Sequence, residues 1–463
     1  MRIALVSANR EKLPDAVVPL GLLYVLASVE SRHDCQLWDI CFEPDQCAAV
    51  RTRIAEHDPQ IIAIGLRNIQ SADYSGCSEN IAYYRELIRT IRECSRATIV
   101  LGGGGLSVMP RELVLDLRPD YAISGEAERA FAELVVALER GGSGLSEIGN
   151  LHFFDGDDLV STPAPSMYQN IDNIPPPDKR YVDNRYYAES GIDSIQTKRG
   201  CPLHCDYCTY PLIEGRSIRQ RDPVRVLAEM FEALDRRPEI CHFFIVDSVF
   251  NLPPAHAKAV CREMIRRSWR TPWTCYANPI GFDRELAELM AAAGCAGLEI
   301  GSDSGVNAVL DRLKKGFRVD RIRDIRDHCS AAGVPDCHSF ILGTQGESMG
   351  DVERTLEFCA ELDPFAAIIG VWTDDYEALD PELAAARQRF RDQVIEVVAR
   401  RSTAFSRWII PSIGINFDAR LFRLLRRKGL KGPLWQHINL RPALAPGRSG
   451  TIAQGKPASR GGQ

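Results

Sequence analysis

Three cysteines in the middle of the chain have a spacing that suits iron–sulfur chemistry. In the segment QTKRGCPLHCDYC they are Cys201, Cys205 and Cys208, which form the pattern Cys-x3-Cys-x2-Cys. Three thiolates on one short loop can bind three corners of a cubane [4Fe-4S] cluster. Because the segment supplies no fourth cysteine, we expect one iron to be left without a ligand from the protein.

An iron with a free coordination position can take part in chemistry. A bidentate amino acid can chelate it, and an electron passed into a sulfonium group held there would break a carbon–sulfur bond and release a carbon radical. The loop therefore predicts a metal site that works together with a sulfonium-bearing ligand.

Two other interpretations of the cysteine loop stay open. Structural zinc usually takes two Cys-x2-Cys pairs set well apart, whereas here the spacings are uneven and His204 stands next to Cys205. A conventional electron-transfer cluster would need a remote fourth cysteine. The chain has 15 cysteines, and we expect the scattered ones to be small buried hydrophobes, since a reducing compartment disfavours disulfides.

The elements around the cysteine loop alternate between strand and helix patterns. Strands are predicted at 195–198, 242–246, 273–277, 297–301, 337–342 and 366–372, with helices at 222–236, 254–268, 283–293, 318–332 and 348–362. Such an alternation is two units short of a complete eight-fold barrel. We expect a partial (β/α)6 TIM barrel over residues 191–375, with its chemistry at the C-terminal ends of the strands.

Residues 1–140 show a second alternation of apolar runs and amphipathic helices. The runs at 3–8, 35–40, 61–66, 98–103 and 121–124 predict an open parallel sheet with helices on both faces. Ligands of such sheets lie beyond the carboxyl ends of the strands. Small residues stand there, because a glycine run follows the fourth strand and Ser-Gly-Glu follows the fifth. A tight turn without a ligand is the other explanation for the glycines.

The remaining segments are predicted to connect, cap or trail the two α/β units. Residues 141–190 form an expected linker with a hairpin at 151–161 and a proline-rich run. Residues 376–443 are expected to be a small helical C-terminal region with an apolar break at 408–414. Residues 444–463, rich in Gly, Ser and Pro, are expected to be disordered.

Composition narrows the function classes. The 463 residues favour two or three domains. A net charge of −6 without a dense basic block argues against nucleic acid as a partner. The start MRIALVSAN predicts a strand rather than a signal peptide, and no stretch reaches the roughly 20 apolar residues of a membrane-spanning helix. We expect a cytoplasmic protein with a small-molecule substrate and no membrane partner.

The cysteine loop resembles that of the radical S-adenosylmethionine (SAM) superfamily, in which an aromatic residue, here Tyr207, precedes the third cysteine. The longer segment QTKRGCPLHCDYCTYP is similar to the cobalamin-binding branch, whose members carry an N-terminal Rossmann-like cobalamin-binding domain. The resemblance covers roughly residues 1–375. It implies three cofactors, a [4Fe-4S] cluster, SAM and cobalamin, and an external electron donor such as flavodoxin or ferredoxin.

The resemblance assigns cofactor-binding positions around the cluster one at a time. Tyr207 matches the residue whose backbone faces adenine, and Asp247 matches a contact to the amino group or to nearby cofactor atoms. In LEIGSDSG, Glu299, Ser302 and Asp303 match the ribose- and carboxylate-binding positions. Acidic residues at strand ends also commonly cap the next helix, and this alternative stays open for each.

Two further groups of positions follow from the resemblance. In SFILGTQGES, Ile341 and Gly343 match its adenine-side motif. The positions that would carry cobalamin are Gly103, Gly104, Ser124, Gly125 and Glu126. The first domain lacks the Asp-x-His-x-x-Gly motif of another cobalamin class, which implies a cobalt without histidine on its lower face.

The chain departs from the family after the sixth barrel strand. In place of a Tyr-Pro-Gly-Thr-like turn it has the sequence VWTDDY. We expect Trp372, Asp374 and Tyr376 to lie near the substrate as candidate catalytic residues, one of which could accept a proton or orient the substrate. The alternative is that the barrel simply ends earlier.

The leading functional hypothesis is a cobalamin-dependent radical SAM methyltransferase. A 5′-deoxyadenosyl radical would remove a hydrogen from an unactivated carbon of a small-molecule or natural-product precursor, and methylcobalamin would supply the methyl group. The second hypothesis keeps the cofactors but replaces methylation by cyclisation, ring rearrangement or oxidation. The third, a regulator that binds cobalamin or a cluster without catalysis, is disfavoured by the acidic strand ends and the open cluster site.

Overall fold

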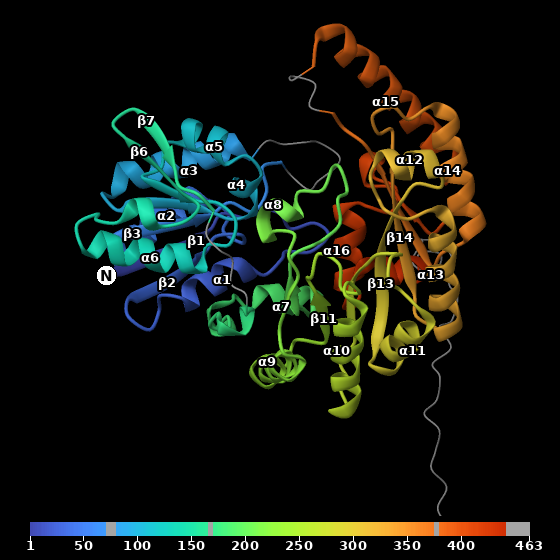
Figure 1. Cartoon of the computed structure of the whole chain (residues 1–463), viewed down its shortest axis with the longest axis horizontal. Coiled ribbons are helices and arrows are strands. Elements are labelled where there is room, and N and C mark those ends of the chain that lie inside the picture. The colour runs from blue at the N-terminus through green and yellow to red at the C-terminus, as the bar shows by residue number, and fades with distance from the viewer. Residues whose placement is uncertain (71–79, 165–169, 375–378, 441–463) are drawn as a thin grey trace, which may run out of the picture.

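A computed structural model of the chain describes residues 1–70, 80–164, 170–374 and 379–440. Figure 1 shows two α/β units side by side, the N-terminal one in blue to blue-green and the second in green to red. Each unit contains a seven-stranded sheet. The predicted fold class, a Rossmann-like domain followed by a partial barrel, is confirmed.

The first sheet has the strand order β2-β1-β3-β4-β5-β6-β7. Its strands are β1 (Arg2–Ser7), β2 (Asp34–Asp39), β3 (Ile61–Gly65), β4 (Thr98–Gly102), β5 (Tyr121–Ile123), β6 (Leu151–Asp155) and β7 (Asp158–Ser161). The first five are parallel, and β6 and β7 are antiparallel. The hairpin expected inside a linker over 141–190 therefore extends this sheet. Pairing with β6 covers the three-residue strand β5, which would otherwise be an open edge.

Helices cover both faces of the first sheet. They are α1 (Leu20–Ala27), α2 (Gln46–His57), α3 (Ile81–Cys94), α4 (Gly104–Val108), α5 (Pro110–Leu117) and α6 (Glu128–Glu139). Strand β1 shows the consequence, because Ile3 and Leu5 pack with α1 and α6 while Ala4 and Val6 pack with α2, α3 and α5. A parallel strand buried on both faces is apolar along its whole length, which is why the sequence alone predicted this strand.

The second sheet is a parallel, open barrel with the order β16-β15-β14-β13-β12-β11-β8. Its strands are β8 (Ile192–Ile195), β11 (His242–Ile245), β12 (Trp273–Ala277), β13 (Cys295–Asp303), β14 (Asp336–Leu342), β15 (Ala366–Val371) and β16 (Trp408–Ile409). Five of the six predicted strands are present, whereas the strand predicted at 195–198 is β8, which lies earlier in the chain and shares only Ile195 with the predicted range. The seventh, β16, comes from the region expected to be helical, and with two residues it is too short to give a strand pattern.

The barrel helices lie on the outside of this sheet (Figure 1). They are α9 (Pro223–Arg236), α10 (Pro254–Arg266), α11 (Arg284–Ala292), α12 (Asn307–Arg312), α13 (Val319–Ala332) and α14 (Met349–Leu362). Local signals start several of them: Asp222 accepts a hydrogen bond from Val224 N before α9, and Ser348 and Asp351 form a capping box on α14.

Shorter elements connect and close the barrel. Around the cysteine loop and linker these are α7 (Arg185–Ser190), β9 (Lys198–Arg199), α8 (Tyr210–Glu214), β10 (Arg219–Gln220) and the 3-10 turns at Leu145–Glu147, Ile171–Asn173 and Lys179–Tyr181. The C-terminal region adds α15 (Pro381–Ser402), α16 (Ala419–Arg427), a turn at Pro411–Ile413 and η6 (Leu434–Leu440). Within the described ranges, no helix has the length and apolar character needed to cross a membrane.

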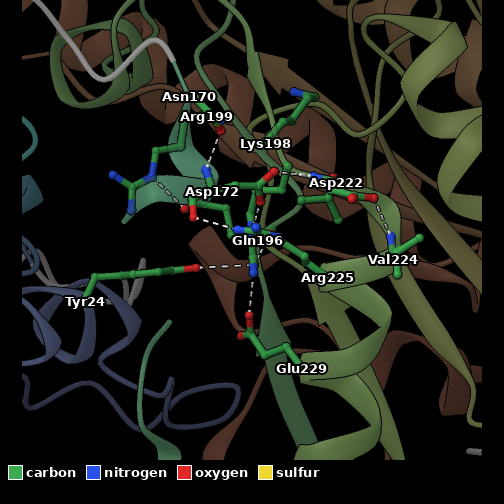
Figure 2. Close-up of polar contacts among 12 residues, drawn as sticks. Tyr24, Asn170, Asp172, Gln196, Lys198, Arg199, Asp222, Val224, Arg225 and Glu229 are labelled. Atoms are coloured by element: carbon green, nitrogen blue, oxygen red, sulfur yellow. Dashed lines mark hydrogen bonds and ion pairs between the residues drawn. The ribbon is translucent and has the colours of Figure 1, made fainter. Parts of the chain in front are cut away.

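One buried arginine joins the first domain, the linker and the barrel. Arg221 donates to Gln196 O at 2.9 Å and to Glu229 Oε2 at 2.8 Å, and it reaches the Tyr24 hydroxyl of α1 at 3.4 Å. Beside it, the linker residue Asp172 accepts a hydrogen bond from Asp222 N. Figure 2 shows Tyr24, Gln196, Glu229 and Asp172 converging from these separate segments. The network holds the strand that leads into the cysteine loop.

Candidate active site between a cysteine loop and two cavities

The cysteine loop follows β9 and returns toward β10. Gly200, which precedes the first cysteine, has a φ of 88°, and a Cβ on it would lie 2.1 Å from Ser217 O. Only glycine allows the two segments to approach so closely. Cys201 N donates to Gly215 O at 3.1 Å, which fixes the start of the loop against its end.

The three loop thiols lie near one another in a partly buried setting. Cys201 is buried, and Cys205 and Cys208 are partly exposed. Burial raises the pKa of Cys205 and of Cys208, and the neighbouring Cys201 sulfur raises each of them further. Among the described residues, no three His, Cys, Asp or Glu side chains are close enough to bind a single metal ion. A cubane makes a different demand, since each thiolate binds its own iron, and three facing thiols suit it.

Asp303 forms a buried polar group with Tyr207 and Lys315 beside the loop. The Tyr207 hydroxyl donates to Asp303 Oδ2 at 2.6 Å, and Lys315 Nζ lies 2.7 Å from the same oxygen. Attraction to the Lys315 charge also acts on the Cys205 thiol. The structure thus brings the predicted residues Tyr207 and Asp303 together with the cysteines. Sequence reasoning missed Lys315, although a buried carboxylate requires a partner.

Asp247 and Ser302 lie inside the barrel wall, bonded to other protein groups. Asp247 is fully buried and accepts hydrogen bonds from Thr197 N at 2.7 Å, Thr197 Oγ1 at 2.5 Å and Lys198 N at 3.2 Å. It therefore links the end of β11 to the root of the loop. The Ser302 hydroxyl lies 2.7 Å from His338 Nδ1. Direct contact of either residue with a cofactor stays a prediction.

The residues after β14 and β15 gather around Arg387 of α15. Its guanidinium lies 2.7 Å from Asp374 Oδ2 and donates to Gly343 O at 2.6 Å. Trp372 Nε1 donates to Asp374 Oδ1 at 3.0 Å, and its ring meets that of Tyr207 edge to face with centroids 6.2 Å apart.

This arrangement changes what the predicted catalytic residues can do. Asp374 is held in an ion pair with Arg387, whereas Trp372 reaches the region of the cysteine loop. Ile341 lies on β14, one strand from β13, and is partly buried. The third candidate, Tyr376, lies outside the described residues.

A cavity of about 580 Å³ occupies the inside of the barrel. Its walls come from inward-facing strand residues, from the N-terminal segment Leu13–Val18 and from the C-terminal segment after β16. Glu299 of β13 lines this cavity and accepts a hydrogen bond from Trp435 Nε1 of η6 at 3.0 Å. The structure therefore separates Glu299 from Asp303, although the two were predicted to share one function.

A second cavity, of about 320 Å³, lies at the carboxyl ends of the first sheet. Its lining includes Gly103, Gly104 and Gly125, three of the positions predicted to carry cobalamin. A Cβ on Gly103 would lie 2.6 Å from Leu66 O, and φ is 100° there. Gly103 therefore lets its turn pack directly on the Leu66 backbone, and both segments line the cavity. The wall formed by Gly103, Gly104 and Gly125, here called the glycine edge, is free of long side chains and suits a corrin ring.

The two cavities adjoin each other. Val17, Val18, Arg67, Ser194 and Val246 line both of them. The strand ends of the first domain therefore open toward the inside of the barrel. No sequence signal indicated this, because the shared residues come from four separate segments of the two domains.

The other two predicted cobalamin positions have protein partners. Ser124 Oγ lies 3.0 Å from His152 Nε2 of the hairpin. Glu126 receives two hydrogen bonds of 2.7 Å from Arg219, and Arg199 Nη2 lies 2.7 Å from Glu128. These pairs are buried and cross from the first domain to the root of the cysteine loop. Glu126 thus holds the domains together, and the sequence pattern did not reveal its arginine partners.

Comparisons with known proteins agree with this division of the chain. The family model of the radical SAM superfamily matches residues 195–359, and that of the B12 binding domain matches residues 6–135. A tryptophan 2-C-methyltransferase of Streptomyces laurentii is 28% identical over 425 residues, covering 78% of this chain and 70% of that protein.

Two further similarities are informative. An anaerobic magnesium-protoporphyrin IX monomethyl ester cyclase of Synechocystis is 27% identical over 332 residues, 69% of this chain and 63% of that protein. The solved structure of the radical SAM methyltransferase TsrM from Kitasatospora setae, with cobalamin and a [4Fe-4S] cluster bound, superposes with a TM-score of 0.81 at 22% identity. It covers 96% of this chain and 98% of that one, and it establishes the shared fold.

Proposed function

Because the chain belongs to the radical SAM superfamily and carries a B12-binding domain, we propose that it is a cobalamin-dependent methyltransferase. Its substrate is a small molecule that is methylated at an unactivated carbon. The observation that carries the proposal is the junction of the two cavities, since a ligand on the glycine edge would face a molecule inside the barrel. An external reductant such as flavodoxin or ferredoxin supplies electrons.

Separate sets of residues would hold the three cofactors. Cys201, Cys205 and Cys208 would hold the cluster, and the backbone at Gly103, Gly104 and Gly125 would carry cobalamin. The Tyr207–Asp303–Lys315 group is placed to bind polar atoms of SAM beside the loop. When bound, these cofactors supply a carbon radical and a transferable methyl group.

The chain itself positions the bound groups relative to one another and excludes water from them. The apolar walls of the barrel cavity exclude water from a reactive carbon centre, which would otherwise meet competing reactions. Phe244, Ile368 and Ile409 form part of these walls. The buried pairs of Arg199 and Arg219 with the first domain keep the cysteine loop at a fixed place relative to the glycine edge, as transfer between two bound groups requires.

The test is an assay of the anaerobic, cluster-reconstituted protein with cobalamin, a reductant and SAM labelled in its methyl group. Incubated with a metabolite extract, the enzyme should release 5′-deoxyadenosine and S-adenosylhomocysteine and place the label in a product. Formation of 5′-deoxyadenosine without S-adenosylhomocysteine or labelled product would rule out methyl transfer while keeping radical chemistry.

The similarity to the cyclase supports a second candidate, a radical ring closure, rearrangement or oxidation without methylation. The mass of the product separates the two. Methylation adds one CH2 to the substrate, whereas ring closure or oxidation changes its hydrogen or oxygen content instead.

A further inference from the structure

One carboxyl group in the barrel cavity stands apart from the polar groups around the cysteine loop. Glu299 lies in the middle of β13, whereas Asp303 ends the same strand. The Glu299 side chain lines the cavity, and Trp435 of the C-terminal segment donates to its Oε1 at 3.0 Å. Of the two oxygens of this carboxyl group, only Oε1 has a hydrogen-bond partner in the part of the chain that the structure describes, and Oε2 has none there.

The surroundings of Glu299 are mainly apolar and aromatic. Lining side chains include Phe244, Tyr276, Ile368, Ile409 and Trp435. The cavity's other carboxylate, Asp15, forms an ion pair with Arg426, whose guanidinium also donates to the carbonyls of Leu430 and Gly432. Glu299 therefore differs from Asp15 in having no such cation among its described contacts.

Such a placement is costly unless a ligand compensates for it. Burial in apolar surroundings penalises a carboxylate, and a hydrogen bond to each oxygen offsets part of this penalty. Burial raises the pKa of Glu299 to about 7, and the hydrogen bond from Trp435 opposes this. Small-molecule sites have this composition, an apolar wall with a few polar groups that fix the orientation of the ligand.

We propose that Glu299 binds the substrate: its Oε2 accepts a hydrogen bond from an N–H or O–H group of a planar, largely apolar molecule in the barrel cavity. The inference rests on the proposed function, because this molecule is then the methyl acceptor. A volume of about 580 Å³ is ample for a ring system of that kind. Glu299 sets the specificity of the site and turns the ring toward the junction with the second cavity.

A pair of probes of nearly equal shape tests the hydrogen bond. Indole presents an N–H, and benzothiophene has a sulfur at the same position. Their dissociation constants are measured by equilibrium dialysis against the holoenzyme, with cluster and cobalamin bound, for the wild type and for Glu299→Ala. The ratio of the two constants cancels general effects on the cavity, as in a double-mutant cycle.

The expected result is that Glu299→Ala weakens indole binding relative to benzothiophene binding by about 10-fold, the size of one hydrogen bond. Glu299→Gln keeps an accepting oxygen and should therefore keep most of the preference for indole over benzothiophene. Trp435→Phe removes a donor to Glu299 but no acceptor for the probe, so the preference remains. Glu229→Gln, a buried carboxylate outside this cavity, serves as the control and leaves the ratio unchanged.

Two outcomes would overturn the inference. One is an indole-to-benzothiophene ratio that is the same in Glu299→Ala and in the wild type. The other is the absence of measurable binding of both probes by the wild type. Neither measurement involves methyl transfer, so failure of the proposed reaction with an intact effect of Glu299→Ala would contradict the proposed function alone.

Discussion

The middle and the C-terminal end of strand β13 carry acidic side chains in opposite surroundings. Asp303 meets a lysine and a tyrosine hydroxyl beside the cysteine loop, whereas Glu299 meets an indole N–H in an apolar cavity. In the sequence LEIGSDSG the two look alike, and the family resemblance gave them a common function. Environment divides their roles, as it does for carboxylate pairs in enzymes generally. Asp303 belongs to the charged group beside the cysteine loop, and Glu299 belongs to the cavity.

The largest expected effect comes from removing the charge of Asp303 beside the cysteine loop. Asp303→Asn leaves the Lys315 ammonium, only 4% exposed, without its counter-charge. We expect the free energy of unfolding to fall by about 3–5 kcal/mol and SAM binding to be lost, as measured by urea unfolding and by equilibrium dialysis. Glu299→Gln at neutral pH is the matched control, and an equal loss in both variants would erase the distinction between the two carboxyl groups.

The buried ion pair between the domains is expected to contribute to stability as Asp303 does, through a charge that loses its partner. Arg219→Met leaves Glu126 buried without its bidentate partner, and should lower the free energy of unfolding by about 3 kcal/mol. It should also weaken cobalamin binding. The exposed pair of Arg236 and Glu232 provides the control, since Arg236→Met should cost at most about 0.5 kcal/mol. Similar costs for both variants would show that burial of the Arg219 pair is unimportant.

Glu299, in the cavity, is expected to change how the stability of the protein depends on pH. The pKa of Glu299, about 7 because of burial, lies above the usual value of a glutamate. Between the two pKa values the folded protein therefore holds a proton that the unfolded chain has released. The contribution of Glu299 to stability is thus greatest below about pH 4 and is lost as pH rises to about 7. Urea unfolding should show an extra decline of about 2 kcal/mol in the wild type relative to Glu299→Gln. Parallel pH profiles of the two proteins would contradict this.

The smallest expected effect lies at the glycine edge. Gly103→Ala forces a positive φ on alanine and pushes a methyl group toward Leu66 O, which should cost about 1–2 kcal/mol of stability. Cobalamin affinity should fall about tenfold, because the Leu66 segment, which lines the same cavity, must shift to make room for the methyl group. Gly141→Ala also has a positive φ but faces open space, so it should strain the chain and leave cobalamin binding unchanged.

Local features of the fold could be predicted from the sequence. Buried parallel strands are apolar throughout, as in β1 and β3, and capping residues such as Asp222 mark where the next helix begins. The attachment of the hairpin β6–β7 to the first sheet could not be predicted, because an alternating pattern does not say which edge it will pair with. Strand β16 was missed for its brevity.

In the site, prediction succeeded where residues are close in sequence and failed where partners are remote. The three cysteines and Tyr207 stand within one segment. By contrast, Glu299 meets Trp435 from the far end of the chain, and Glu126 meets Arg219 across the domain boundary. A single sequence gives no information on such pairings, and the roles of Glu126 and Glu299 depend on them.

The central claim is that one chain holds an iron–sulfur cluster and a corrinoid on two separate sets of residues. The most direct test is the absorption spectrum of anaerobically purified protein, reconstituted with iron and sulfide and given hydroxocobalamin, for the wild type and for the triple variant Cys201→Ala, Cys205→Ala, Cys208→Ala. The wild type should show the bands of both cofactors, and the triple variant should lose the iron–sulfur band and keep the corrinoid bands. A triple variant that retains its iron, or a wild type that binds no corrinoid, would contradict the account.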